Sequence, residues 1–178
     1  MAHRDTGGVV RAAVWIPPSG AALEKIQDLI NEVHRRGGGP RVQPHLTLLG
    51  GIETTLADAQ AKLKDLAARV GPFEIRTGRM DWRHEYYRCF FLAVELTPEL
   101  AAAKRAAHEI FEMNPPEPFE PHVSLMYGDP HGNFKQDLAA ELGGRLDTSF
   151  TARVIRLVNA SPSVAVPEWR ALAEQTLS

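Results

Sequence analysis

A single cysteine, Cys89, occurs among the 178 residues of the chain. One cysteine excludes an intramolecular disulfide framework and any zinc site that is built from several cysteines. Because Cys89 lies in the apolar run CFFLAV, we expect its thiol to be buried and to take no part in catalysis. The fold must therefore be stabilised by a hydrophobic core, and the chain is long enough to form one.

The sequence also lacks long apolar runs and an excess of basic residues. No stretch approaches the length of a membrane-spanning helix, and the first residues, MAHRDTGG, contain no apolar core of a signal peptide. We therefore expect a cytoplasmic protein that makes no contact with a membrane. Lys and Arg number 20 against 22 Asp and Glu, which gives a net charge of −2. Since long nucleic acids bind to basic surfaces, we exclude them as partners and expect a small substrate.

The remaining composition is that of an ordinary globular protein, with 44% hydrophobic and 24% charged residues. At this length we expect one domain over residues 1–178, acting as a monomer.

Three segments show helical periodicity and have a capping residue in front of them. The expected N-caps are Ser19, Thr55 and Thr97, and Pro98 suits the first position of the third helix. A further short helix is expected around Leu138. The apolar stripes of the first two helices are Leu23, Ile26, Ile30 and Val33, and then Leu56, Leu63, Leu66 and Val70.

Segments rich in β-branched and aromatic residues lie between these helices and predict strands. Besides two segments described next, the expected strands are residues 9–16, 73–82, 86–96 and 150–158. The proline-rich stretch 114–121 predicts a rigid loop, and the last segment, from Trp169, fits either a helix or a strand. The order of strands and helices predicts an α+β protein with two similar lobes that face each other across a cleft.

Two short segments of the chain repeat one pattern. PHLTLLGG at residues 44–51 and PHVSLMYG at residues 121–128 both read Pro-His-apolar-hydroxyl-Leu-apolar-x-Gly. In a strand, residues i and i+2 point to the same side, so each segment presents one imidazole and one hydroxyl on one face. A single copy of this pattern would carry little weight, whereas two copies in the same register are improbable by chance. The alternative to an active site is a duplicated structural segment that has lost its activity, or that binds a ligand without turning it over.

Two imidazoles and two hydroxyls fit the hydrolysis of a cyclic phosphodiester. One imidazole can accept a proton from water while the other protonates the leaving sugar oxygen, and both can do so near neutral pH. The hydroxyls can donate to the phosphate oxygens, where charge accumulates in the transition state. The sequence contains no HExxH motif and no carboxylate beside either histidine, so we expect no metal and no cofactor.

The two motifs resemble the twin His-x-Thr/Ser signatures of the 2H phosphoesterase superfamily. Within it, the chain is similar to cyclic phosphodiesterases that open ADP-ribose 1″,2″-cyclic phosphate and nucleoside 2′,3′-cyclic phosphates. The resemblance extends over nearly the whole chain and includes the strands VWIPP and YYRCFFLAVEL. It implies a bilobed α+β fold with a central cleft, metal-independent catalysis and a strand for the last segment.

The resemblance also assigns roles to individual residues. His45, Thr47, His122 and Ser124 match the catalytic quartet, with His122 as the base and His45 as the acid. The resemblance further implies that Tyr127 closes over the phosphate or ribose, and that Trp15 lies against a base. Strict alternation along the strand would place Tyr127 on the face opposite His122, although Gly128 allows the strand to end there. The remaining histidines, among them His108 and His131, are expected at the surface.

Two other functions are compatible with the sequence. One is a related 2H enzyme that acts on RNA ends or on 2′,5′-linked oligonucleotides, for which short oligomers would suffice. The other is a nucleotide-binding module without catalysis, which could dispense with one histidine or hydroxyl. The presence of all four groups favours an enzyme.

Overall fold

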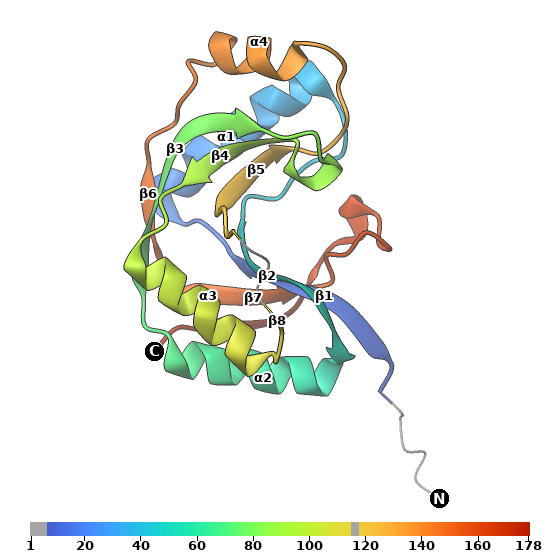
Figure 1. The fold of residues 1–178 in the computed structure, drawn as a ribbon, viewed down its shortest axis with the longest axis vertical. Helices are drawn as coiled ribbons and strands as arrows, with labels where there is room; N and C mark the ends of the chain where they lie inside the picture. The colour runs from blue at the N-terminus through green and yellow to red at the C-terminus, as the bar shows by residue number, and fades with distance from the viewer. Residues whose placement is uncertain (1–6, 115–117) are drawn as a thin grey trace, which may run out of the picture.

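Eight strands form one curled antiparallel sheet in the order β6-β3-β4-β5-β2-β1-β7-β8, in a computed structural model that describes residues 7–114 and 118–178 (Figure 1). The predicted α+β class is confirmed. The strands are β1 (Val9–Ile16), β2 (Leu46–Thr55), β3 (Phe73–Trp82), β4 (Phe90–Val94), β5 (His122–Met126), β6 (Ser149–Ala152), β7 (Val154–Val158) and β8 (Ala171–Thr176).

Four α-helices and two 3₁₀ turns complete the part of the chain that the structure describes. They are α1 (Gly20–Gly37), α2 (Leu56–Arg69), α3 (Pro98–Ile110), α4 (Phe134–Glu141), η1 (Tyr86–Arg88) and η2 (Val166–Glu168). Within residues 7–114 and 118–178, no helix has the length and apolar character that a membrane span requires.

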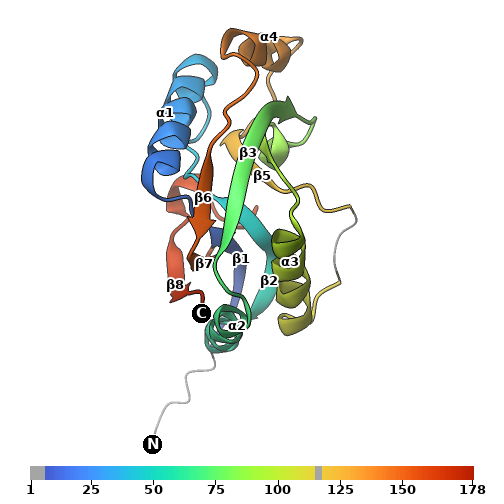
Figure 2. The same ribbon diagram turned by 90° about the vertical axis from the view of Figure 1, so that its left-hand side faces the viewer.

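The molecule has two lobes, each formed by four neighbouring strands and the helices that pack on them, and Figures 1 and 2 show one lobe above the other. The first lobe contains β2, β1, β7 and β8, and α2 and α3 pack on it. The second lobe contains β5, β4, β3 and β6, and α1 and α4 pack on it. The lobes are therefore not consecutive halves of the chain, because α1 crosses to the second lobe and the last two strands return to the first. Buried side chains of both lobes belong to one continuous hydrophobic cluster.

The predicted helix starts are largely confirmed. The hydroxyl of Thr55 accepts a hydrogen bond from the backbone of Asp58 at 3.2 Å, and that of Thr97 accepts one from Leu100 at the same distance. Ser19 occupies the N-cap position of α1, but its side chain makes no capping bond. The apolar stripes are correct except at Leu23 and Leu56, which are exposed in the first turns, and at Val70, which follows the last residue of α2 and is half-buried. In α1 the buried stripe continues four residues before Ile26, at Ala22, rather than three residues before it.

Two predicted strands differ from the structure. The expected strand 150–158 is two strands, β6 and β7, because the chain leaves the second lobe for the first at Arg153. The expected strand from Tyr86 starts only at Phe90, since Tyr86–Arg88 forms the turn η1. The final segment is the strand β8, as the family resemblance implied. Of the expected loop 114–121, residues 115–117 lie outside the described residues.

The two histidine strands meet at the centre of the sheet. They pair at one position, Leu46 with Val123, and these residues occupy the same place in the two repeated motifs. When equivalent residues of two antiparallel strands face each other, a local pseudo-two-fold axis passes between them. This axis relates the first motif to the second and brings their polar faces to the same region, between the lobes.

Candidate active site

Both motif histidines are held by the same backbone contact. The Nδ1 of His45 lies 2.6 Å from the carbonyl oxygen of Gln43, and the Nδ1 of His122 lies 2.9 Å from that of Glu120. A carbonyl oxygen can only accept, so each Nδ1 must carry a hydrogen and donate it. Each Nε2 is then the nitrogen that can accept or deliver a proton.

The two histidines and two hydroxyls line one cavity of about 160 Å³ between the lobes. The structure therefore brings together all six residues singled out in the sequence. These are Trp15, His45, Thr47, His122, Ser124 and Tyr127. The Ser124 hydroxyl is buried, lies 3.4 Å from the carbonyl of Tyr87 and is also hydrogen-bonded to the Tyr127 side chain. Thr47 is half-buried.

Cross-strand pairing explains where the aromatic residues beside the histidines lie. Trp15 on β1 faces Thr47, and Phe91 on β4 faces Ser124, so each lobe has an aromatic residue beside its motif. The Trp15 indole stacks on the His45 ring, with centroids 3.5 Å apart and planes at 9°. Phe91 contacts His122 less closely, at 4.9 Å and 52°. One face of Trp15 is therefore occupied by the His45 imidazole.

Irregular strand pairing explains how Tyr127 reaches the cavity. The register between β4 and β5 shifts after the pair Phe91 and Ser124, and an extra residue in one strand moves the following side chains to the other face. Tyr127 follows the end of β5, lines the cavity and is 4% exposed. The strict alternation assumed for the sequence is wrong at this position. Burial raises the pKa of the Tyr127 hydroxyl, which therefore stays protonated.

Two further aromatic residues of the cavity, Tyr87 and Trp169, were missed in the sequence. Their rings are 5.8 Å apart, and Trp169 also lies 5.8 Å from Tyr127 and 6.0 Å from Trp15. The indole of Trp169 donates to the carbonyl of Val164 at 3.0 Å, which fixes the ring. Both residues come from irregular segments, η1 and the approach to β8, where no periodicity indicates the direction of a side chain.

Burial lowers the pKa of both imidazoles. His45 is 5% exposed, and its removal from water lowers its pKa from 6.5 to about 4, although its contact with Gln43 opposes the shift. The pKa of His122 is also lowered, mainly by burial and further by the Arg88 guanidinium, while Glu120 opposes the change. Because His122 is only half-buried, it loses less hydration than His45. Both rings are therefore mostly neutral at pH 7 in the free protein.

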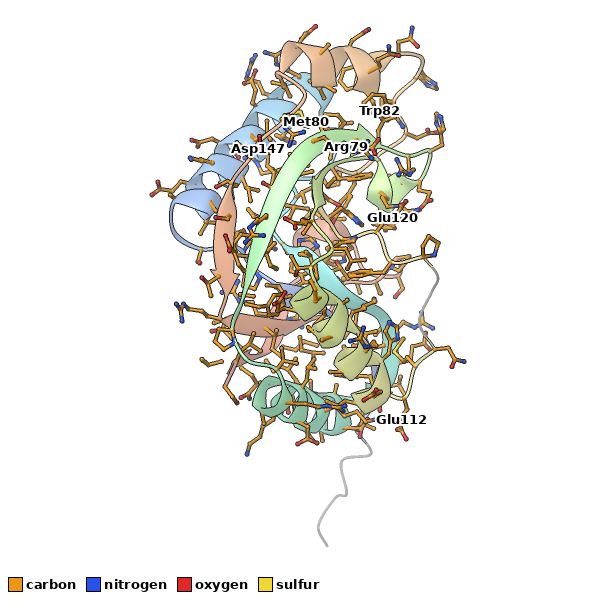
Figure 3. All side chains as sticks on the ribbon, turned by 60° about the vertical axis from the view of Figure 1, so that its left-hand side comes forward. Arg79, Met80, Trp82, Glu112, Glu120 and Asp147 are labelled. Carbon is orange, nitrogen blue, oxygen red and sulfur yellow. The ribbon has the colours of Figure 1, made fainter. Side chains whose placement is uncertain are left out.

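A second cavity, of about 440 Å³, adjoins the first, since Thr47 and His122 line both. Its other walls include Arg83, Arg88 and Glu120. The guanidinium groups of both arginines contact the Glu120 carboxylate, Arg88 at 2.9 Å and Arg83 at 3.4 Å. Figure 3 shows Glu120 beside the η1 turn. The arginine positive charges are thus partly neutralised before any ligand binds.

The other histidines and possible metal ligands add little to this site. His131 is exposed, as expected, whereas His108 is buried on α3, with its Nδ1 3.2 Å from the carbonyl of Met113. The expectation of a surface position for His108 is wrong, because α3 is covered on that side by the chain that follows it. Within residues 7–114 and 118–178, no group of three or more His, Cys, Asp or Glu side chains is arranged to hold a metal ion. Cys89 is buried, as predicted.

The low pKa of His45 predicts an acid-sensitive fold. In the unfolded chain His45 becomes protonated below pH 6.5, whereas in the folded protein it stays neutral down to about pH 4. The free energy of unfolding should therefore fall as the pH drops from 6.5 to about 4. The shift corresponds to a loss of roughly 3 kcal/mol in the free energy of unfolding. Urea denaturation at pH 7 and pH 4.5 measures it. In His45→Gln, which cannot titrate, most of this contribution should vanish. An unchanged pH dependence in that variant would contradict the assignment.

Comparison with known proteins agrees with the fold and the motifs. The profile of the 2′-5′ RNA ligase superfamily matches residues 16–161. This chain therefore belongs to that superfamily, the 2H phosphoesterases, and the predictions of the family and of an enzyme of the phosphoesterase class are confirmed.

Individual relatives are more distant. The cyclic phosphodiesterase of Arabidopsis thaliana is 24% identical over 145 residues, which cover 82% of this chain and 80% of the relative. The crystal structure of apo LigT from E. coli shares 16% identity and superposes with a TM-score of 0.63 over 96% of this chain and 99% of LigT. LigT complexed with 3′-AMP gives a TM-score of 0.58 at 15% identity, over 95% and 98% of the two chains. The predicted bilobed fold is therefore confirmed.

Proposed function

We propose that this protein hydrolyses small cyclic phosphodiesters, nucleoside 2′,3′-cyclic phosphates or ADP-ribose 1″,2″-cyclic phosphate, to phosphomonoesters. The observation that carries the proposal is the shared cavity of His45, Thr47, His122 and Ser124, with each Nδ1 bound to a carbonyl and each Nε2 left for proton transfer. The name of the Arabidopsis relative and the 3′-AMP bound to LigT support the same substrate class.

The reaction needs one proton acceptor and one proton donor. The oxygen of a water molecule attacks phosphorus while one imidazole takes its proton, and the bond from phosphorus to one ribose oxygen breaks. The second imidazole gives its proton to that oxygen, so the products are a phosphomonoester and a free ribose hydroxyl. Thr47 and Ser124 donate hydrogen bonds to the non-bridging oxygens. After the reaction the base is protonated and the acid is neutral, and proton exchange with solvent returns both rings to their starting states.

Burial suggests which histidine takes which role. His45 is the more deeply buried ring and has a pKa of about 4, so it is neutral and able to accept a proton in the free protein. His122 is only half-buried and keeps more of its hydration, so it holds a proton more readily than His45 and suits the acid. We therefore propose His45 as the base and His122 as the acid, the reverse of the roles that the family resemblance implied.

The second cavity supports a related substrate class. An oligonucleotide that ends in a 2′,3′-cyclic phosphate or a 2′,5′-linkage could place its reacting phosphate at Thr47 and His122, and extend its neighbouring nucleotide toward Arg83 and Arg88. The ion pairs of these arginines with Glu120 weaken their attraction for a further phosphate. We therefore keep this as the second candidate.

Phosphorus NMR tests both candidates in one series. The purified protein is incubated with each 2′,3′-cyclic mononucleotide, with ADP-ribose 1″,2″-cyclic phosphate, and with a short RNA that has a cyclic phosphate end. Appearance of a phosphomonoester signal from the small substrates supports the first proposal. Faster turnover of the RNA end would favour the second, and no turnover of any substrate would overturn both.

Hydrolysis is expected to continue in an excess of EDTA. Both Nε2 atoms are needed as proton carriers, which they could not be if they were bound to a metal ion. Initial rates are measured before and after dialysis against the chelator. A loss of turnover that zinc or manganese restores would show that the histidines are metal ligands instead.

A further inference from the structure

Lys104, on α3, is buried although it lies outside the residues assigned to the cavity. It is 9% exposed, and lysines are almost never buried without a partner for their charge. In the part of the chain that the structure describes, no carboxylate forms an ion pair with it, and only burial acts on its pKa. Its ammonium group must therefore be held by other contacts.

The first contact joins Lys104 to the strand of the first motif. Its Nζ donates a hydrogen bond to the carbonyl oxygen of Leu48 at 2.7 Å. Leu48 directly follows Thr47, in the section of β2 beyond the single pair that joins β2 to β5. Since the two strands separate there, Lys104 supplies a donor to a buried carbonyl of the motif strand.

The second contact joins Lys104 to the approach of the second motif. The ring of Phe119 lies over the ammonium group, 4.6 Å from Nζ to the ring centroid. The next residue is Glu120, whose carbonyl orients the imidazole of His122. Phe119 also lines the second cavity together with Thr47 and His122. A desolvated cation over an aromatic face is attracted to it, so this contact fixes the segment that leads into β5.

We infer that Lys104 is a positioning residue that sets the distance between the two catalytic motifs. Its one ammonium group connects the strand of Thr47 with the segment that orients His122, at the place where backbone pairing between the motif strands stops. It does not line the cavity that contains the two imidazoles and the two hydroxyls. The inference rests on the proposed function, because it assigns Lys104 to the alignment of an acid and a base that must act in one step.

The experiment compares Lys104→Met with a matched variant. Methionine keeps the length and apolar stem of lysine but has no charge and no N–H group. The control is Lys135→Met on α4, since Lys135 is also buried, at 4% exposed, and also donates to a carbonyl at 2.7 Å, that of Arg83. With a 2′,3′-cyclic nucleotide, we expect Lys104→Met to lower kcat about ten- to hundredfold with little change in KM, because misalignment affects the transition state most. Lys135→Met should destabilise the fold but keep kcat within about twofold.

Two further variants separate positioning from general stability. Lys104→Arg should recover much of kcat, because a guanidinium can also donate to Leu48 and stack on Phe119. Phe119→Leu should lower kcat in the same direction, and its effect should not add to that of Lys104→Met. A folded Lys104→Met enzyme with normal kcat, or an equal loss of kcat in Lys135→Met, would overturn the inference. If Lys104→Met does not fold, Phe119→Leu and Lys104→Arg decide the question.

Failure of the proposed function gives a different result. If the unaltered protein turns over none of the cyclic phosphates, that function is wrong, whatever the variants do. Alignment of the motifs is then measured by ¹⁵N NMR of the histidine rings. The signals of His45 and His122 should shift in Lys104→Met and remain in place in Lys135→Met, and unchanged signals in both variants would overturn the positioning role.

Discussion

Replacing either His45 or His122 by Ala should lower the turnover of a 2′,3′-cyclic nucleotide by about two to four powers of ten while the fold is retained. In the proposed reaction each ring transfers a proton, and water is a poor substitute for a positioned imidazole. The double variant should be little worse than the worse single variant, because the acid and the base act in one step. Steady-state kinetics with circular dichroism as a check of folding measure these effects. His131→Ala is the matched control, since His131 is exposed and lies outside the cavity.

The pH profile of these variants assigns the two roles. The unaltered enzyme should show a bell-shaped dependence, because one imidazole must be neutral and the other protonated. With His45 as the base, its removal should abolish the acidic limb, and removal of His122 should abolish the alkaline limb. If removal of His45 abolished the alkaline limb instead, and removal of His122 the acidic limb, then His122 would be the base and His45 the acid, as the family resemblance implied. Near-normal rates in His45→Ala would mean that the first motif is only a strand.

Replacing Leu48 by Ala should cost about 2–5 kcal/mol in the free energy of unfolding, because the side chain is fully buried and leaves a cavity. The adjacent change Thr47→Val should leave stability nearly intact, since valine keeps the shape of threonine. It should instead weaken transition-state binding by roughly 1–3 kcal/mol, because one donor to the phosphate is lost.

Urea denaturation and kcat/KM, measured on both variants, distinguish the side chain of β2 that stabilises the core from the one that acts in the cavity. Thr47→Ser retains the hydroxyl and should keep most of the activity, which serves as the control. The corresponding pair in the second lobe is Leu125 and Ser124, for which the same division is expected. Loss of folding in Thr47→Val with normal specific activity would show that the assignment of the faces is wrong.

Those features of the fold that depend on local sequence could be predicted. Thr55 and Thr97 cap their helices because the capping bond forms within one turn. His45 and Thr47 share a face because the alternation of a strand is a local property, and the repeated motif indicated that a second pair would face the first. The resemblance to the family added the strand assignment of the last segment, which its own sequence left open.

The features that depend on distant parts of the chain could not be predicted. Tyr87 and Trp169 reach the cavity from a 3₁₀ turn and an irregular segment, and their approach is set by packing between residues far apart in the sequence. The interruption at Arg153 arises because neighbouring residues join different lobes. Lys104 lies in a helix of ordinary composition, and nothing in its sequence neighbourhood indicates that a backbone carbonyl of β2 would accept a hydrogen bond from it.

The pseudo-two-fold axis between Leu46 and Val123 has a chemical counterpart in the proposed reaction. In an in-line displacement at phosphorus, the entering and departing oxygens lie on opposite sides of the phosphorus atom, and a two-fold axis through that atom exchanges them. A site with one imidazole and one hydroxyl from each motif presents similar groups to both oxygens. By microscopic reversibility, ring closure would then use the same two imidazoles with their duties exchanged. The differences between the lobes, namely Trp15 stacked on a buried His45 against Phe91 beside a more accessible His122, can only decide which imidazole accepts the proton during hydrolysis.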